Sequence, residues 1–182
     1  MNEHMQHVYP CPSGATMSAM DAVQHVDAVT RRVEPLGEGW VLSLSRVVPG
    51  VPRTVWPHWQ QAVASTGARA DELLDPEGWR GSLEVDGVTS WVAADLARDG
   101  GQTVLTVQHA LPAGVVDGPQ QDVAAALVAR GLVWDRLLWG LGRAVEAERG
   151  ELEDVPARED EAADAASELW RVAARQAGIH PR

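Results

Sequence analysis

The chain has 182 residues, of which 45% are hydrophobic and 23% charged, so we expect one globular domain with one core. Its formal net charge is −11 and Arg31-Arg32 is the only basic pair, so a nucleic-acid partner is not expected. Cys11 is the only cysteine, which excludes an intramolecular disulfide, and no apolar run approaches the ~18 residues of a membrane span, so we expect a cytoplasmic protein.

The first 20 residues mix Pro, Ser, Gly and Met without a period, which predicts a mobile N-terminal tail. His4, His7 and Cys11 in this tail have side chains that bind zinc. A tail cannot hold them in place and a fourth ligand is missing, so we expect no metal site there.

The first structured segment is predicted from Asp21, where valines recur at helical intervals as far as Val33. The run is short, rich in β-branched residues and followed by Pro35, so it is either a weak helix or an extended arm. Alternating apolar residues from Trp40 to Val48 then predict the first strand.

The middle of the chain predicts a short helix followed by an antiparallel meander. Val55, Trp59 and Val63 share one face of a helix that ends near Gly67. The acidic residues 68–78 end in a turn, so we expect a solvated loop there. Three strands follow, over residues 79–85, 88–96 and 102–111, joined by turns at Asp86-Gly87 and Asp99-Gly100-Gly101.

Two helices complete the predicted elements. Residues 121–148 carry a continuous apolar stripe, formed by Leu127, Trp134, Leu137, Leu138, Leu141 and Val145. Gly131, Gly140 and Gly142 each cost about 1 kcal/mol relative to alanine in a helix, so we expect close packing on a flat surface such as a sheet. An acidic linker over residues 151–161 leads to a second amphipathic helix, whose apolar face holds Ala162, Ala166, Leu169, Trp170, Ala173 and Ala177.

This order of elements resembles the START-like (SRPBCC, helix-grip) superfamily. The run WVLSLSRVVPGVPRTVW (40–56) is similar to the family's opening strand and helix, and GQTVLTVQHALP (101–112) is similar to its strand with a histidine before Leu-Pro. The run ARGLVWDRLLWGLGRAV (129–145) resembles its long helix. The tail SELWRVAARQAGI (167–179) resembles an extension found in a bacterial branch of Hsp90 ATPase activator homologues.

The resemblance implies an α+β fold in which a curved antiparallel sheet grips a long C-terminal helix, with one extra helix after it. The segment from Trp56 to Trp91 is short for the family's full set of strands, so the sheet could lack a hairpin. We divide the chain into a tail over residues 1–20, a helix-grip domain over 21–150, and an acidic linker with a helical extension over 151–182.

A candidate ligand site lies between the predicted sheet and the long helix. The residues expected to line it are Val92, Ala94, Leu96, Leu105, Val107, His109, Trp134, Leu138 and Leu141. The same side chains would equally form a filled core, and His109 could be a satisfied structural histidine instead of a ligand contact. Trp91 and Asp95 are expected on the outer face of the sheet.

The resemblance implies a non-enzymatic module that binds a small apolar ligand or a protein partner, such as an Hsp90-type chaperone, without a cofactor or metal. The sequence has no nucleophile elbow, zinc-protease motif, Walker loop or dinucleotide fingerprint. Two alternatives stay open: a small-molecule enzyme of the cyclase or hydrolase kind with His109 as acid or base, and a structural or regulatory protein with a solid core. The sequence leaves the oligomeric state open.

Overall fold

The fold combines four helices with one six-stranded sheet in the computed structural model, which describes residues 22–116, 118–150 and 159–180. The elements in chain order are α1 (Ala22–Ala28), β1 (Thr30–Leu36), β2 (Gly39–Pro49), α2 (Pro52–Ala64), β3 (Arg69–Leu74), β4 (Gly78–Val85), β5 (Val88–Asp99), β6 (Gln102–Leu111), α3 (Gln120–Glu148) and α4 (Glu159–Gln176). The predicted α+β class is therefore confirmed. The predicted tail over residues 1–20, with His4, His7 and Cys11, and most of the acidic linker lie outside the described residues.

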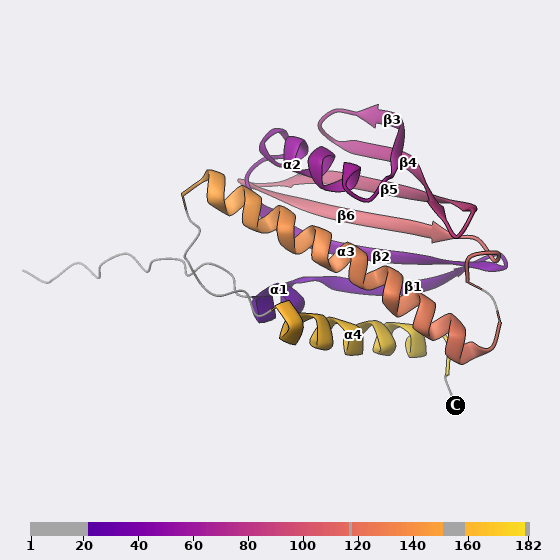
Figure 1. Ribbon diagram of the computed structural model, residues 1–182. Helices are drawn as coiled ribbons and strands as arrows, with labels where there is room; N and C mark the ends of the chain where they lie inside the picture. The colour runs from indigo at the N-terminus through magenta and orange to yellow at the C-terminus, as the bar shows by residue number, and fades with distance from the viewer. Residues whose placement is uncertain (1–21, 117, 151–158, 181–182) are drawn as a thin grey trace, which may run out of the picture.

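The sheet is antiparallel throughout and its strand order is β1-β2-β6-β5-β4-β3. The strands from β3 to β6 form a meander, while β2 pairs with β6 and carries β1 on the other edge. Figure 1 shows α3 running diagonally across the sheet, with α2 on one side of it and α1 and α4 on the other. The sheet is curved and unclosed, and the long helix α3 packs against its inner face.

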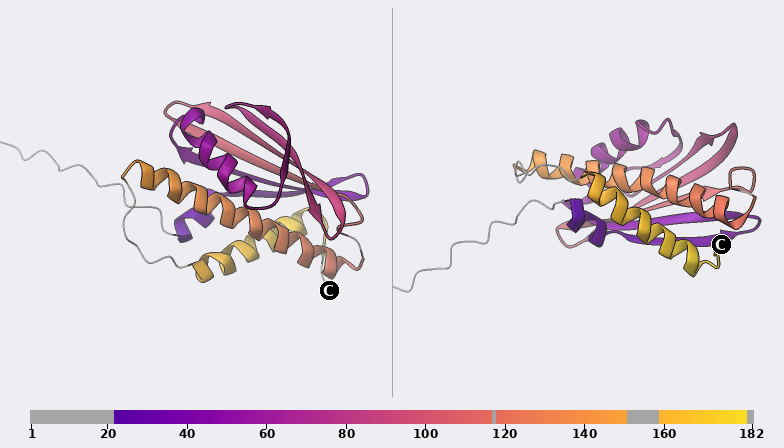
Figure 2. Two further views of the ribbon diagram at one scale, coloured as in Figure 1. Left: turned by 45° about the horizontal axis from the view of Figure 1, so that its top comes forward. Right: turned by 60° about the horizontal axis from the view of Figure 1, so that its bottom comes forward.

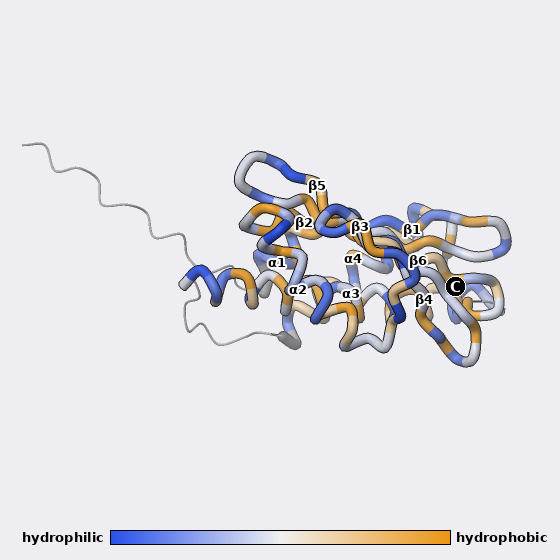
Figure 3. The backbone as a smooth tube through the Cα atoms, turned by 90° about the horizontal axis from the view of Figure 1, so that it is seen from above, coloured by the Kyte–Doolittle hydropathy of each residue, from blue (hydrophilic) through white to orange (hydrophobic). Residues whose placement is uncertain are grey.

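The period-two pattern of the strands separates an inner from an outer face. Leu42 pairs with His109 and His109 with Val92, so this row of the sheet points toward the helix. The neighbouring row, Val41, Ala110 and Trp91, points away from it. Figure 3 shows the resulting mixture of hydrophobic and hydrophilic positions along the strands. None of the described helices is long and apolar enough to cross a membrane.

The prediction for residues 21–33 was wrong in part, because this stretch holds both a helix and the start of a strand. A short α1 ends at Ala28, and β1 begins at Thr30 and continues through Pro35 to Leu36. Proline cannot donate to a neighbouring strand, but β1 is an edge strand and does not need that hydrogen bond on its open side. Pro35 therefore does not stop the segment.

The loop predicted over residues 68–78 was also wrong, since Arg69–Leu74 forms the edge strand β3. All six of its residues are exposed, so no alternation of apolar and polar residues marks it in the sequence. Its pairing with β4 gives the sheet six strands.

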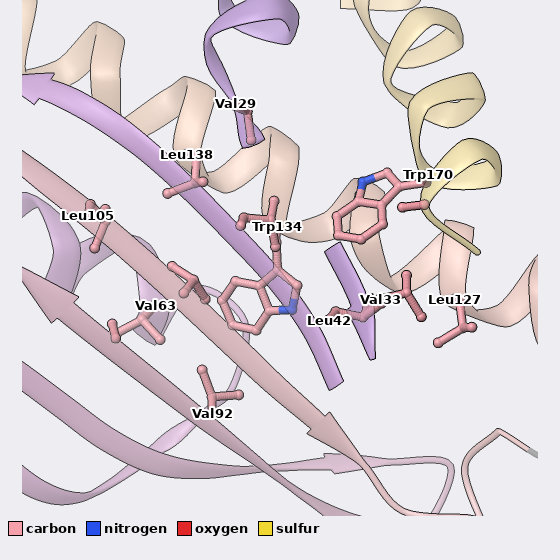
Figure 4. Close-up of a cluster of buried hydrophobic side chains, with 14 of the residues drawn as sticks. Val29, Val33, Leu42, Val63, Val92, Leu105, Leu127, Trp134, Leu138 and Trp170 are labelled. Carbon is pink, nitrogen blue, oxygen red and sulfur yellow. The ribbon is translucent and has the colours of Figure 1, made fainter. Parts of the chain in front are cut away.

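The long helix packs on the inner face of the sheet, as predicted. Figure 4 shows Trp134 and Leu138 of α3 pointing toward Leu105 and Val92 of the sheet. The buried core that they share also contains Leu96, Val107, Leu141 and Val145. The apolar stripe of α3 packs on the apolar inner face of the sheet, because both surfaces must be buried and α3 follows the last strand in the chain.

The glycines of α3 do mark close packing at two of three positions, but the neighbours are not the sheet backbone. A Cβ at Gly131 would collide with the indole of Trp170 on α4. A Cβ at Gly142 would collide with the guanidinium of Arg46 on β2. A Cβ at Gly140 would meet open space among the described residues, so nothing in the structure explains that glycine.

Helix α4 belongs to the same core as the sheet, because it packs on α3, α1 and β1. Ala166, Trp170 and Ala173 are buried as predicted. Leu169 was expected on the same face but is exposed, because the buried face centres on Trp170 and leaves Leu169 at its margin.

Candidate functional site

The predicted site residues lie together between the sheet and α3, and their polar atoms are paired with one another. Trp134 donates from Nε1 to Nδ1 of His109 at 3.0 Å, which leaves the ring proton of His109 on Nε2. That proton is donated to Ser90 Oγ at 2.8 Å, and Ser90 in turn donates to the Leu83 carbonyl at 2.8 Å. The predicted site residues included His109 and Trp134 but not Ser90.

The nine predicted lining residues, Val92, Ala94, Leu96, Leu105, Val107, His109, Trp134, Leu138 and Leu141, are all buried, and they belong to or adjoin one packed cluster. In the described part of the chain, the cavities that we find do not include His109 or Trp134 in their walls. A ligand contact by these nine side chains stays a prediction.

Acidification is expected to destabilise the protein through His109. Burial, and then the charge of Arg130, lowers the pKa of His109 from 6.5 to about 4. Between these values the unfolded chain takes up a proton that the folded chain does not, so the free energy of unfolding falls as the pH falls. The loss is complete near the folded pKa and amounts to roughly 3 kcal/mol.

The pH effect of His109 can be isolated with the variant His109→Gln, which cannot take up that proton. Urea unfolding at about pH 7 and about pH 4 should show wild type losing more stability than the variant. His180→Gln is the control, because it makes the same substitution at a histidine whose side chain is exposed. Equal losses in wild type and His109→Gln would contradict the lowered pKa.

A second buried polar cluster centres on Asp135, on the side of α3 that faces β1 and α4. Arg31 of β1 donates from Nε to Asp135 Oδ2 at 3.0 Å and from Nη2 to Oδ1. Trp170 of α4 donates from Nε1 to Oδ2 at 2.6 Å. Nη1 of Arg31 also donates to the carbonyls of Val26 and Val29, each at 2.8 Å. Asp135 therefore links β1 and α4 to the long helix through a buried, bidentate ion pair.

Arg46 extends this cluster to β2 and α1. Its Nη1 donates to the Leu138 carbonyl at 2.8 Å and to Nδ1 of His25 at 2.9 Å. A guanidinium can only donate, so Nδ1 of His25 accepts and the ring proton is assigned to Nε2. Burial, then the charges of Arg46 and Arg31, lowers the pKa of His25 to about 3, and the backbone of Asp135 opposes this shift. The ring is therefore neutral near pH 7.

A cavity of about 110 Å³ lies beside this cluster, and we call it the α1–α3–α4 cavity after the helices that line it. The right-hand view of Figure 2 shows these three helices side by side. The cavity combines apolar walls with a few polar side chains, and its lining residues are His25, Val26, Leu132, Asp135, Arg136, Trp139, Ala162, Ala163 and Ala166.

Two N–H groups from the walls of the α1–α3–α4 cavity, His25 Nε2 and Trp139 Nε1, are buried and have no hydrogen-bond partner among the described residues. We call them the cavity donors. Nε2 of His25 is 3.9 Å from Asp135 Oδ1, which is too long for a hydrogen bond, and His25 as a whole is only 3% exposed. The Asp135 backbone near the ring opposes the lowering of the His25 pKa by burial but makes no hydrogen bond of acceptable geometry to Nε2. A buried donor without an acceptor costs about 1–3 kcal/mol, so an acceptor in this cavity would be stabilising.

The α1–α3–α4 cavity was not predicted from the sequence, although two residues beside it carry a signal in the sequence. Arg46 continues the inner-face alternation of β2, where an apolar residue would be usual. Asp135 stands four residues from Gly131 and three from Leu138 in a buried row of α3. A charged residue in a buried row predicts a partner, but nothing local identifies Arg31 or Trp170 as that partner.

Comparison with known proteins supports the fold. No family model matches the chain, and no curated protein matches it. The crystal structure of CalU16 from Micromonospora echinospora superposes with a TM-score of 0.57 at 15% identity, covering 81% of this chain and 99% of that chain. The solution structure of CalU16 gives a TM-score of 0.55 at 18% identity, with 82% and 94% covered. A protein of unknown function, EF2215 from Enterococcus faecalis, gives 0.49 at 14% identity, with 88% and 96% covered.

At these identities the likeness to CalU16 concerns the fold alone. It confirms the helix-grip arrangement that the order of the sequence elements predicts, over the 81% of the chain that the crystal structure covers. The more specific resemblance to the Hsp90-activator-like branch stays a prediction, and the ligand and partners do too.

Proposed function

We propose that this chain is a non-enzymatic binding module that holds a small molecule in the α1–α3–α4 cavity. One observation carries the proposal: both cavity donors belong to the walls of a space that Val26, Leu132 and three alanines of α4 also line. A ligand that offers an acceptor would pair these donors, and its apolar part would lie against Val26, Leu132 and the alanines of α4.

The volume of the α1–α3–α4 cavity limits the ligand to a few heavy atoms. At about 110 Å³ it is smaller than the ~150 Å³ engineered cavity that is known to accept benzene, and well below the ~300 Å³ at which drug-sized pockets begin. We therefore propose a small molecule of roughly five to eight heavy atoms in place of the larger apolar ligand that a hollow helix-grip interior would hold.

The alternative of an enzyme that uses His109 has less support. A general base must reach the proton that it removes within about 3 Å or through one water. Both ring nitrogens of His109 are already engaged, by Trp134 and by Ser90, and the residue is 1% exposed. Substrate could reach this imidazole only if the packed core around it opened.

A second candidate function, docking of a protein partner, is favoured by the outer face of the sheet. Trp91 is 56% exposed there, next to Ala110 and in the same row as Val41. An exposed tryptophan among apolar neighbours is common at protein interfaces. The sequence resemblance makes an Hsp90-type chaperone in the cytoplasm the partner to test. We expect the wild-type chain to capture this chaperone and the variant Trp91→Ala to lose that capture.

The binding proposal predicts that filling the cavity abolishes ligand binding. Thermal shift with a panel of molecules of roughly five to eight heavy atoms should identify a stabilising ligand, worth about 2.7 kcal/mol at 100 times its Kd. Ala163→Leu should remove that stabilisation, because Ala163 lines the cavity. Ala165→Leu is the matched control, since Ala165 lies on the exposed face of the same helix.

Two outcomes would contradict the binding proposal. If no molecule of the panel stabilises the wild-type chain, the α1–α3–α4 cavity is a structural gap. If Ala163→Leu binds the ligand as tightly as Ala165→Leu does, the ligand site lies elsewhere in the molecule.

A further inference from the structure

The chemistry of the cavity donors restricts what can occupy the α1–α3–α4 cavity, and the following inference rests on the proposed function. His25 cannot accept a hydrogen bond at Nε2, because Nδ1 already accepts from Arg46 at 2.9 Å and the proton is on Nε2. An indole N–H is likewise a donor only, so Trp139 cannot accept either. A ligand group that only donates would leave both cavity donors unpaired.

The charges around the α1–α3–α4 cavity favour an anion over a neutral acceptor. The Arg136 side chain lines the cavity, and Arg143 lies over the Trp139 ring, with Cζ 5.4 Å from the ring centroid. Arg46 donates to His25 in the buried cluster, and the charge of Arg31 also acts on this ring. Because Arg31 is paired with Asp135 and Arg46 interacts with Glu146, the positive charge that a ligand would meet comes from Arg136 and Arg143.

The carboxylates near the same cavity are the groups that would oppose an anion. Asp135 lines the cavity, but both of its oxygens accept hydrogen bonds, one from Arg31 and the other from Arg31 and Trp170. Glu146, which is buried, interacts with Arg46. On α4, Glu161 is exposed to solvent, where its charge is screened. The Asp135 carboxylate is thus held by Arg31 and Trp170, and Arg136, which is exposed as Glu161 is, is the cationic side chain among the lining residues.

We infer that the α1–α3–α4 cavity binds a small aliphatic monocarboxylate. Its carboxylate oxygens accept from the N–H groups of His25 and Trp139, with Arg136 supplying the positive charge. Its short aliphatic part contacts Leu132 and Ala163. Hydrogen bonds to a charged acceptor are about twice as strong as neutral ones, which is why a carboxylate should bind more tightly than an amide or a ketone of the same shape.

The test compares isobutyrate with isobutyramide, which have nearly the same shape and differ in charge. Isothermal titration of the full chain should give isobutyrate at least a tenfold lower Kd than isobutyramide. Trp139→Phe, which removes one N–H and keeps an aromatic ring, should weaken isobutyrate about tenfold or more. Arg136→Gln should weaken isobutyrate and leave isobutyramide nearly unchanged, because only the acid uses the charge.

Trp91→Phe is the matched control for Trp139→Phe, because it makes the same substitution on the outer face of the sheet and should leave both Kd values unchanged. If isobutyramide binds as tightly as isobutyrate, or if Trp139→Phe has no effect on isobutyrate, the carboxylate inference is wrong. The proposed function survives the failure of the carboxylate inference if another small molecule binds the chain and Ala163→Leu abolishes that binding. If nothing binds at all, both the inference and the proposed function fail.

Discussion

Asp135→Ala is expected to lower the free energy of unfolding by about 3–5 kcal/mol, the cost of leaving one member of a buried ion pair without its partner. The substitution would strand the Arg31 guanidinium, whose side chain is 3% exposed, and would remove the acceptor of the Trp170 indole. Because Asp135 joins β1 and α4 to the long helix, α4 should be released before the sheet unfolds.

The matched control for Asp135→Ala is Asp95→Ala. Asp95 accepts from Arg80 at 2.6 Å, but this pair lies at the surface, where an ion pair contributes about 0–1 kcal/mol. Urea unfolding followed by circular dichroism gives both changes in free energy, and hydrogen exchange reports the release of α4. Similar effects for the two variants would show that the Asp135 cluster is not held in a low-dielectric interior.

Most of the fold could be predicted because its elements carry strong periodic signals. The strand predicted over residues 102–111 coincides with β6, and the helix predicted over 121–148 differs from α3 by one residue. Both bury one continuous apolar face, and burial is what the sequence pattern reports. The edge strand β3 is fully exposed and held by its hydrogen bonds to β4, so no comparable pattern exists for it.

The candidate site was harder to predict than the fold, because it depends on contacts between distant segments. Arg31 and Asp135 are 104 residues apart, and Arg46 and His25 are 21 apart. In the sequence, Arg31 stands out only as part of the basic pair Arg31-Arg32. Each of these residues is ordinary in its local context, and only the packing of α1 and α4 beside α3 brings them together.

His109 illustrates the opposite case, in which the sequence indicated the right position and left the role open. Its place in the inner-face alternation of β6 predicted burial, which the structure has at 1% exposure. The partners of its two ring nitrogens come from β5 and α3, so the sequence could not distinguish a ligand contact from an internal hydrogen-bond network.

Leu141→Ala should lower the free energy of unfolding by about 2–5 kcal/mol, because Leu141 lies in the stripe of α3 that packs into the core and is 2% exposed. The loss combines the transfer of the removed methyl groups with the cavity that they leave behind. A domain of ordinary stability, about 5–15 kcal/mol, would then be close to unfolding at elevated temperature.

Trp91→Ala is the comparison for Leu141→Ala, because Trp91 has a larger side chain and lies on the outer face of the sheet, whereas Leu141 of α3 packs against the inner face. Trp91 is 56% exposed, so its loss should cost distinctly less than that of Leu141 despite its size. Urea unfolding of the two variants gives the loss of stability for a side chain packed on the inner face and for one on the outer face. A larger effect for Trp91→Ala would mean that the outer face is itself buried in solution, against another copy or a partner, and that the helix is not the principal cover of this sheet.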